Sequence, residues 1–337
     1  MALNMTFDLP LIWAGLIAFA VLAYVILDGF DLGVGILFLF VKGEPNRDQM
    51  MNSVAPVWDG NETWLVLGGG GLFAVFPLAY AVIMPALYAP IMAMLLALVF
   101  RGVAFEFRWK TDRKYLWDWA FTVGSTAAAF FQGIALGAFV QGIPVAGRAY
   151  DGGWWDWLTP FSLTTGVALV IGYALLGATW LIWKTDGEVQ ERSVKFAWIT
   201  GVLTLALIGI VSLWTPFLNE QFQARWFAWP QGLYVMPVPT LVLGCAIALY
   251  VGLRDRRELM PFIASLGLFV LSFIGLCISF YPHIVPSSVT IWEAAAPENS
   301  LRFLLVGASV LLPMILAYTF YSYWVFRGKV NAVGGYH

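Results

Sequence analysis

Residues 9–27 read LPLIWAGLIAFAVLAYVIL, an apolar stretch without a single charged side chain. A helix needs roughly 20 such residues to cross the hydrocarbon core of a bilayer. Seven further charge-free runs follow along the chain, at 65–100, 119–147, 157–183, 196–219, 226–253, 259–292 and 303–326. Only 11% of the 337 residues are charged, against about 25% in a soluble domain. The sequence therefore predicts a polytopic membrane protein.

The runs are long and continuous and show no period-two alternation, so helices are favoured over the strands of a barrel. The run over 65–100 is too long for one helix and is expected to break near Pro77. This predicts an all-α transmembrane helical bundle of about nine helices, at 9–41, 50–76, 79–103, 117–142, 161–183, 196–217, 235–253, 261–283 and 301–326. We expect a single membrane domain, 1–337, built from two four-helix groups (1–142 and 143–283) and one peripheral helix with the C-terminal tail (284–337).

Basic residues predict the orientation of this bundle. Of the 18 lysines and arginines, 15 fall on the side that holds the loops after the odd-numbered helices and the C-terminus, and Arg148, Arg225 and Arg302 fall on the other side. Basic residues are enriched in cytoplasmic loops. We therefore expect the N-terminus outside and the C-terminus inside. The first segment lacks a basic start and a small-residue cleavage site, so it is not expected to be a signal peptide.

Four carboxylates, Asp28, Asp31, Asp59 and Glu62, interrupt the first two predicted helices. Charged groups inside a bilayer are costly, rare and usually functional. Each pair is three residues apart and so shares a helix face. A rise of 1.5 Å per residue puts both pairs at similar depth, in the inner half of the membrane. We interpret them as a polar path, most simply for protons.

Neighbouring residues are expected to assist these acids. Asn61 and Thr63 add hydrogen-bonding capacity to the path, and Arg101 at the inner end of the third helix is a candidate counter-charge. Supporting roles are expected for Glu106, Asp118, Trp58 and Trp64. The alternative is structural, because buried carboxylates can also cap backbone groups, pair with Arg101 or contact another subunit.

Histidine and cysteine are scarce. The two histidines are His283, expected at the outer end of the eighth helix, and His337, the last residue. Cys245 and Cys277 are single cysteines, expected to be small core residues. No CxxC or CxxCH sequence occurs. The chain is expected to ligate no metal and to hold no redox centre of its own.

Several segments together resemble subunit II of cytochrome bd-type quinol oxidases. They are LDGFDLGVG (27–35), APVWDGNETW (55–64), RGVAFEFR (101–108), WDW (117–119) and PHIVPSS (282–288). The resemblance covers essentially the whole chain in the same order. The length and the glutamate at position 62 look closer to the cyanide-insensitive branch of the family.

The resemblance implies a bacterial cytoplasmic membrane protein that pairs with a homologous subunit I. That subunit would carry haems b558, b595 and d and the quinol site, and the complex would reduce O₂ to water with cytoplasmic protons. Asp59, with Asp28 and Glu62, would line a proton path toward the haems. A structural quinone and a small single-helix accessory subunit occur in some members. Membrane lipid is an expected partner and nucleic acid is not.

Two alternatives from other functional classes stay open at this point. Paired carboxylates at membrane depth also suit a self-sufficient proton-coupled transporter. The second half of the chain lacks matching acids, which argues against a transporter built from two equivalent repeats. A purely structural partner subunit, with the acids anchoring the assembly, is the other alternative.

Overall fold

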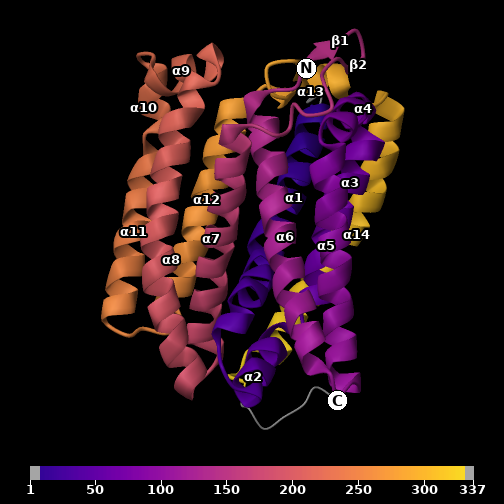
Figure 1. Cartoon of the computed structure of the whole chain (residues 1–337). Coiled ribbons are helices and arrows are strands. Elements are labelled where there is room, and N and C mark those ends of the chain that lie inside the picture. Colours follow the sequence, from indigo (N-terminus) through magenta and orange to yellow (C-terminus); the bar gives the residue numbers. More distant parts are fainter. Residues whose placement is uncertain (1–7, 331–337) are drawn as a thin grey trace, which may run out of the picture.

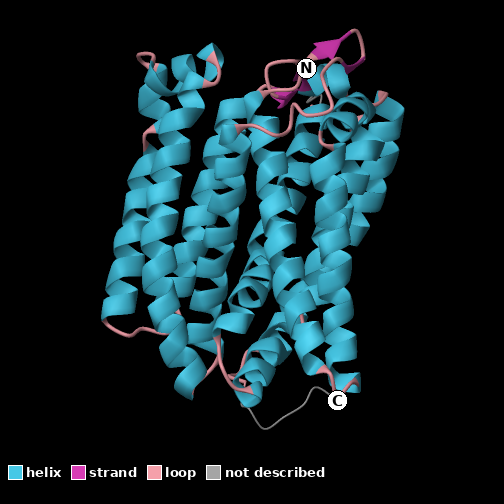
Figure 2. Ribbon diagram, in the orientation of Figure 1, coloured by secondary structure: helices cyan, strands magenta, loops and turns pink. Residues whose placement is uncertain are grey.

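The computed structural model describes residues 8–330, which fold into a bundle of long helices (Figures 1 and 2). Within this range eight helices are long and apolar enough to cross a membrane. They are α1 (Leu9–Leu37), α5 (Tyr88–Phe107), α6 (Lys114–Gln141), α7 (Pro160–Lys184), α8 (Gly187–Trp214), α11 (Pro237–Arg254), α12 (Met260–Phe280) and α14 (Glu298–Val325). The predicted all-α transmembrane bundle is confirmed.

The predicted second helix, 50–76, is divided into α2 (Glu44–Val54) and α3 (Trp58–Val75). Pro56 lies in the gap between them. Inside a helix, a proline ring clashes with a carbonyl of the preceding turn, and proline has no backbone N–H to donate, so the helix is interrupted here. The predicted third helix, 79–103, is likewise divided into α4 (Pro77–Ala86) and α5, with Leu87 between them. The break at Pro56 lets α2 turn aside at one end of the bundle, here called the α2 end (Figure 1).

Helix α8 begins at Gly187, nine residues before its expected start at 196. A charge-free run marks only the part of a helix that is in the hydrocarbon. The first turns of α8 continue into polar surroundings, where Glu188 and Arg192 form an ion pair one turn apart at 2.6 Å. The helix is therefore longer than its apolar segment.

Short elements gather at the end opposite α2 (Figure 1). They are the hairpins β1 (Val145–Ala146) with β2 (Ala149–Tyr150) and β3 (His283–Val285) with β4 (Val289–Thr290), and the helices α9 (Glu220–Phe227), α10 (Gln231–Val235) and α13 (Ile291–Ala294). Single 3-10 turns follow α1, α5 and α8, at Phe38–Phe40, Arg108–Lys110 and Thr215–Phe217. Both antiparallel hairpins thus connect helices outside the spanning layer.

Helix α1 packs against α3, α6 and α7 in the middle of the bundle. Gly33 and Gly177 bring α1 and α7 together, since a Cβ atom on Gly33 would lie 1.8 Å from the carbonyl oxygen of Tyr173. Small residues let transmembrane helices approach closely, and these two glycines do so between α1 and α7. A large buried core formed by α1, α5, α6, α7 and α12 surrounds this contact.

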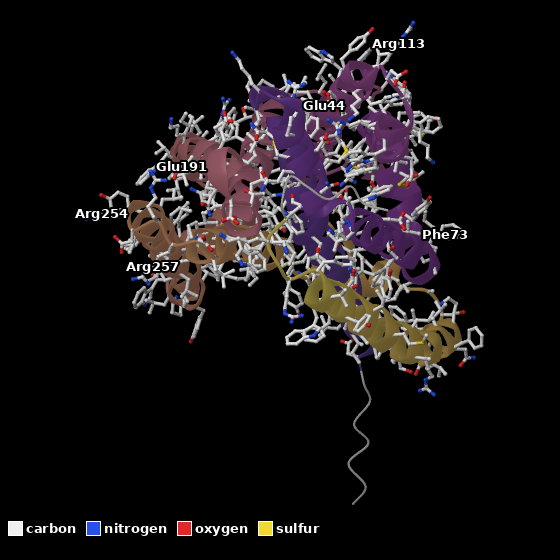
Figure 3. The ribbon with its side chains drawn as sticks, turned by 90° about the horizontal axis from the view of Figure 1, so that it is seen from below. Glu44, Phe73, Arg113, Glu191, Arg254 and Arg257 are labelled. Atoms are coloured by element: carbon white, nitrogen blue, oxygen red, sulfur yellow. The ribbon has the colours of Figure 1, made fainter. Side chains whose placement is uncertain are left out.

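Helix α14 lies at the edge of the bundle beside α3 (Figures 1 and 3) and presents most of its surface outward. The segment after it returns beneath the bundle at the α2 end. The Val330 amide donates to the Lys184 carbonyl at 2.8 Å, and the Gln49 side chain donates to the Val330 carbonyl at 2.7 Å. These bonds fix the segment after α14 against α2 and α7.

Candidate functional site: an acid cluster around Arg101

Arg101 on α5 is the centre of a buried ionic cluster. Its side chain is 0% exposed, and its Nη2 lies 2.9 Å from Asp28 Oδ1 and 3.7 Å from Asp31 Oδ2. Its Nη1 donates to Glu62 Oε1. Three helices thus bring their polar residues to one guanidinium: α1 supplies two acids, α3 supplies one and α5 supplies the arginine. The structure thus places Arg101, the candidate counter-charge, among three of the four acids named from the sequence.

Aromatic rings enclose the guanidinium on one side. Trp58 stacks on Phe105 at 4.7 Å between ring centroids, and the Arg101 guanidinium carbon lies 5.6 Å and 5.5 Å from those two rings. Such rings attract a cation electrostatically and exclude water. Trp58, one of the residues named from the sequence, therefore lies directly beside the cluster.

Asn61 joins the cluster to α14. Its Nδ2 donates to Asp31 Oδ2 at 2.6 Å and to the Leu27 carbonyl at 3.3 Å. The Tyr323 hydroxyl donates to Asn61 Oδ1 at 2.9 Å. The amide is therefore held from both sides, and it connects Asp31 to a tyrosine that follows Asn61 by 262 residues.

The cluster holds three carboxyl groups and one guanidinium. Asp28, Asp31 and Arg101 are fully buried, and only Glu62 is partly exposed, at 26%. Both Asp28 oxygens and Asp31 Oδ1 accept no well-directed hydrogen bond. Taking an ion out of water costs several kcal/mol unless pairing and hydrogen bonds repay it. One arginine cannot neutralise three carboxylates, so the chemistry that this site offers is proton binding and exchange.

Asp59 and Thr63 lie on the outer face of α3, away from Arg101. Both are exposed, as are Val66 (72%) and Phe73 (62%) on the same face. Figure 3 shows Phe73 at the edge of the bundle. The Thr63 hydroxyl donates only to the Asp59 carbonyl, at 3.3 Å. Asp59 is thus separated from the buried acids but stands one turn from Glu62.

Trp64 is buried and meets the edge of Phe19 at 5.7 Å between centroids, so it packs α3 on α1. Glu106 is exposed and lies 3.6 Å from Lys110. Neither residue contacts the Arg101 cluster. Trp64 acts in packing, and Glu106 belongs to the surface.

Asp118 belongs to a second buried site at the α2 end. Its carboxylate accepts from Arg108 Nε at 2.6 Å and from Arg47 Nη1 at 2.9 Å. Arg108 also contacts Asp48 at 2.6 Å. Sequence analysis overlooked Arg108, although it follows Arg101 by seven residues and so shares its helix face. No sequence spacing pointed to Tyr323, because α14 comes next to α3 only in the folded chain.

Among residues 8–330, no group of three or more histidine, cysteine, aspartate or glutamate side chains is arranged to hold a metal ion. His283 lies in β3, because α12 ends at Phe280 rather than at 283 as expected. His337 lies outside the described residues. Cys245 is half-buried and Cys277 is exposed, so the expectation that both are core residues is wrong for Cys277.

Comparison with known proteins places this geometry in a family. Residues 9–326 match the family described as cytochrome bd terminal oxidase subunit II. The chain is 30% identical over 361 residues to cytochrome bd-I ubiquinol oxidase subunit 2 of Escherichia coli K12, covering 96% of this chain and 95% of the relative. It is 30% identical over 332 residues to cytochrome bd ubiquinol oxidase subunit 2 of Bacillus subtilis, with 95% and 96% covered.

The fold also resembles that of the bd oxidase from Geobacillus thermodenitrificans, with a TM-score of 0.77 and 19% identity over 96% of this chain and all of that one. At this identity the likeness concerns the fold. The family match and the two relatives cover nearly the whole sequence and include all the residues of the Arg101 cluster. The chain belongs to the family of cytochrome bd terminal oxidase subunit II, and it is therefore a subunit of an oxidoreductase complex.

Proposed function

We propose that this chain is the subunit of a membrane quinol:O₂ oxidoreductase that ligates no haem itself, stabilises the haem-bearing subunit I and carries protons for the reduction of O₂ to water. The observation that carries the proton role is the excess of three carboxyl groups over one guanidinium at Arg101, buried at membrane depth. Haems b558, b595 and d would belong to subunit I, as the family resemblance implies. A structural quinone and a single-helix accessory subunit are further proposals on the same ground.

The outer face of α3 supports a partner at this position. Asp59 and Thr63 are exposed there within an apolar surface that continues through Val66 and Phe73. A carboxylate facing lipid is unfavourable, and such groups almost always face other protein or water. Gly69 and Gly70 on the same face leave open space around their Cα atoms, which permits close approach of another helix. We assign this face to subunit I.

The proton route then runs through α3. Glu62 is partly exposed and pairs with Arg101, while Asp59 lies one turn earlier on the partner-facing side. Protons bound by Asp28 and Asp31 would pass through Glu62 to Asp59 and on to the haem subunit. The membrane would be the bacterial cytoplasmic membrane. The basic residues at the α2 end favour that end as the cytoplasmic side.

The Asp59→Asn variant tests this function in the assembled complex. An amide keeps the shape of the side chain but binds no proton, so turnover per haem should fall while haem content is unchanged. Glu106→Gln is the matched control, because Glu106 is an exposed carboxylate that lies outside the cluster. Full activity of Asp59→Asn across the pH range would contradict conduction through Asp59, and loss of haem would point to a structural role.

A further inference from the structure

A small pocket separates α3 from α14 at the α2 end. Its polar lining is formed by Asn61 on α3 and by Tyr318, Thr319, Ser322 and Tyr323 on α14. Its volume is about 20 Å³. A water molecule needs a cavity of roughly 10–15 Å³ by this measure and two to four polar partners. The pocket is therefore of the size and polarity for one water.

The floor of this pocket reaches the acid cluster. Asn61 and Tyr323 both line it, and they form the hydrogen-bonded series Tyr323 hydroxyl, Asn61 amide and Asp31 carboxylate. The Leu27 carbonyl also accepts from Asn61 Nδ2, at 3.3 Å. Because a carbonyl oxygen only accepts, this bond keeps the amino group toward Asp31 and leaves Oδ1 to accept from Tyr323. Tyr323 thus fixes the amide that lies between the pocket and Asp31.

The pocket and Asp59 lie on opposite sides of α3. At 100° per residue, Asn61 is about 200° from Asp59 around the helix. The mouth of the pocket is close to the last turn of α14, since Ser322 is three residues from the helix end at Val325. Asn61 contacts Asp31 on the pocket side, whereas Glu62, the partly exposed acid of the cluster, lies one turn from Asp59. The two sides of α3 therefore offer one way into the cluster and one way out.

We propose that the pocket between α3 and α14 is the water entrance through which protons reach Asp31, and that Tyr323 is the positioning residue that controls the Asn61 amide at its floor. This proposal rests on the proposed proton role and adds the source of the protons. When the amide moves aside, a protonated water in the pocket loses an O–H bond as an O–H bond forms on Asp31. Water from the adjacent aqueous phase then replaces the proton carrier.

Thiol labelling tests the entrance without any use of turnover. In the complete complex, with Cys245 and Cys277 replaced by alanine, Ser322→Cys should react with the small cationic reagent aminoethyl methanethiosulfonate. The matched control is Ser309→Cys, an exposed serine higher on the same helix. A thiolate forms far more readily in water than in hydrocarbon, so Ser322→Cys should react at least about tenfold faster, measured by mass spectrometry. Equal rates would overturn the entrance.

Tyrosine variants test the positioning role. Tyr323→Phe removes the hydrogen bond that holds the Asn61 amide in place. The amide then moves aside more readily, so proton uptake on oxidation of the reduced complex by O₂ should become about fivefold faster, as expected for the loss of one buried hydrogen bond. Its pH dependence should change as well. Tyr321→Phe is the control, because Tyr321 is exposed on the same helix. Identical rates and pH profiles for the two variants would overturn the role of Tyr323. Failure of Asp59→Asn to affect turnover would instead contradict the route beyond the cluster and leave the labelling result standing.

Discussion

Two arginines seven residues apart, one on α5 and one at the start of the 3-10 turn that follows it, occupy buried ionic sites of opposite character. Arg101 and Arg108 are both 0% exposed. Each lies near aromatic rings, Arg101 over Trp58 and Phe105, and Arg108 over Phe38 and Trp109. The same residue type on one helix face thus serves two sites, and the difference lies in the acids around it.

The Arg108 site is balanced in charge. Three cations and three anions are joined by ion pairs there: Arg47, Arg108, Lys114, Glu44, Asp48 and Asp118. Lys114 also lowers the pKa of exposed Glu44, through a hydrogen bond and its charge. The Arg101 site has three acids for one cation and lies deeper between α1 and α3. A balanced network needs no exchangeable proton, whereas an acid excess in low dielectric does. The difference in charge balance supports the proposed proton transfer by the acids at Arg101 and favours an anchoring role for Arg108.

The largest expected effect, on assembly of the complex, follows loss of Arg101, the one cation of the Arg101 cluster. Arg101→Met leaves three buried carboxyl groups without a counter-charge, and breaking a buried pair typically costs about 3–5 kcal/mol. We expect little assembled complex, measured as haem-containing protein per unit of membrane. Arg101→Lys keeps the charge and should recover part of the yield. Normal assembly of Arg101→Met would contradict the importance of the pairing.

Asp118→Asn should have the next largest effect, confined to stability. Arg108 and Arg47 each lose a charged partner, while Asp48 still pairs with Arg108. Hydrogen bonds to charged groups contribute about 1.5–3 kcal/mol, so the melting temperature of the complex should fall. Turnover per haem should not change. Slower proton uptake in the Asp118→Asn complex that still assembles would contradict a purely anchoring role for the Arg108 site.

Glu62→Gln should have the opposite effect to Asp118→Asn: turnover should fall while stability changes little. Removing one of three acids relieves the excess of negative charge, so the free energy of unfolding should change by less than about 1 kcal/mol. Turnover should nevertheless fall, because Glu62 connects Arg101 to the Asp59 side of α3. Thermal unfolding and oxygen consumption of one preparation separate the two effects. A large loss of stability without loss of turnover would make Glu62 an anchoring residue.

The smallest effect concerns the C-terminal segment. Lys329 contacts Asp186 at 2.7 Å and Glu258 at 2.5 Å on the surface. A hydrogen bond from Lys329 lowers the pKa of Glu258 below its ordinary value of 4.5. The Lys329–Glu258 pair therefore stabilises the fold fully at pH values above 4.5. This contribution is lost as the pH falls through the lowered pKa of Glu258. Lys329→Ala should lower the melting temperature slightly at pH 7 and not at all in strong acid. An equal change at both pH values would contradict an ionic origin.

The sequence predicted the bundle because hydrocarbon imposes long apolar runs on helices that cross it. It named Arg101 as a candidate counter-charge for the buried acids, because residue spacing and the rise of a helix can be read from the local sequence. It could not separate Asp59 from Glu62, since the face of α3 that is covered depends on packing against α1. The contact of Tyr323 with Asn61 joins residues far apart in the chain, and it follows only from the path of α14 along α3. The assignment to the cyanide-insensitive branch stays a prediction.

In the proposed function, the acid excess at Arg101 carries the protons consumed in O₂ reduction. The most direct measurement is time-resolved proton uptake, read with a pH-indicator dye, after the fully reduced complex is mixed with O₂. Asp31→Asn and Asp118→Asn should be compared in preparations of equal haem content. We predict that uptake slows strongly in Asp31→Asn and proceeds at the unmodified rate in Asp118→Asn. Unchanged uptake in Asp31→Asn, or equal slowing in both variants, would contradict the account.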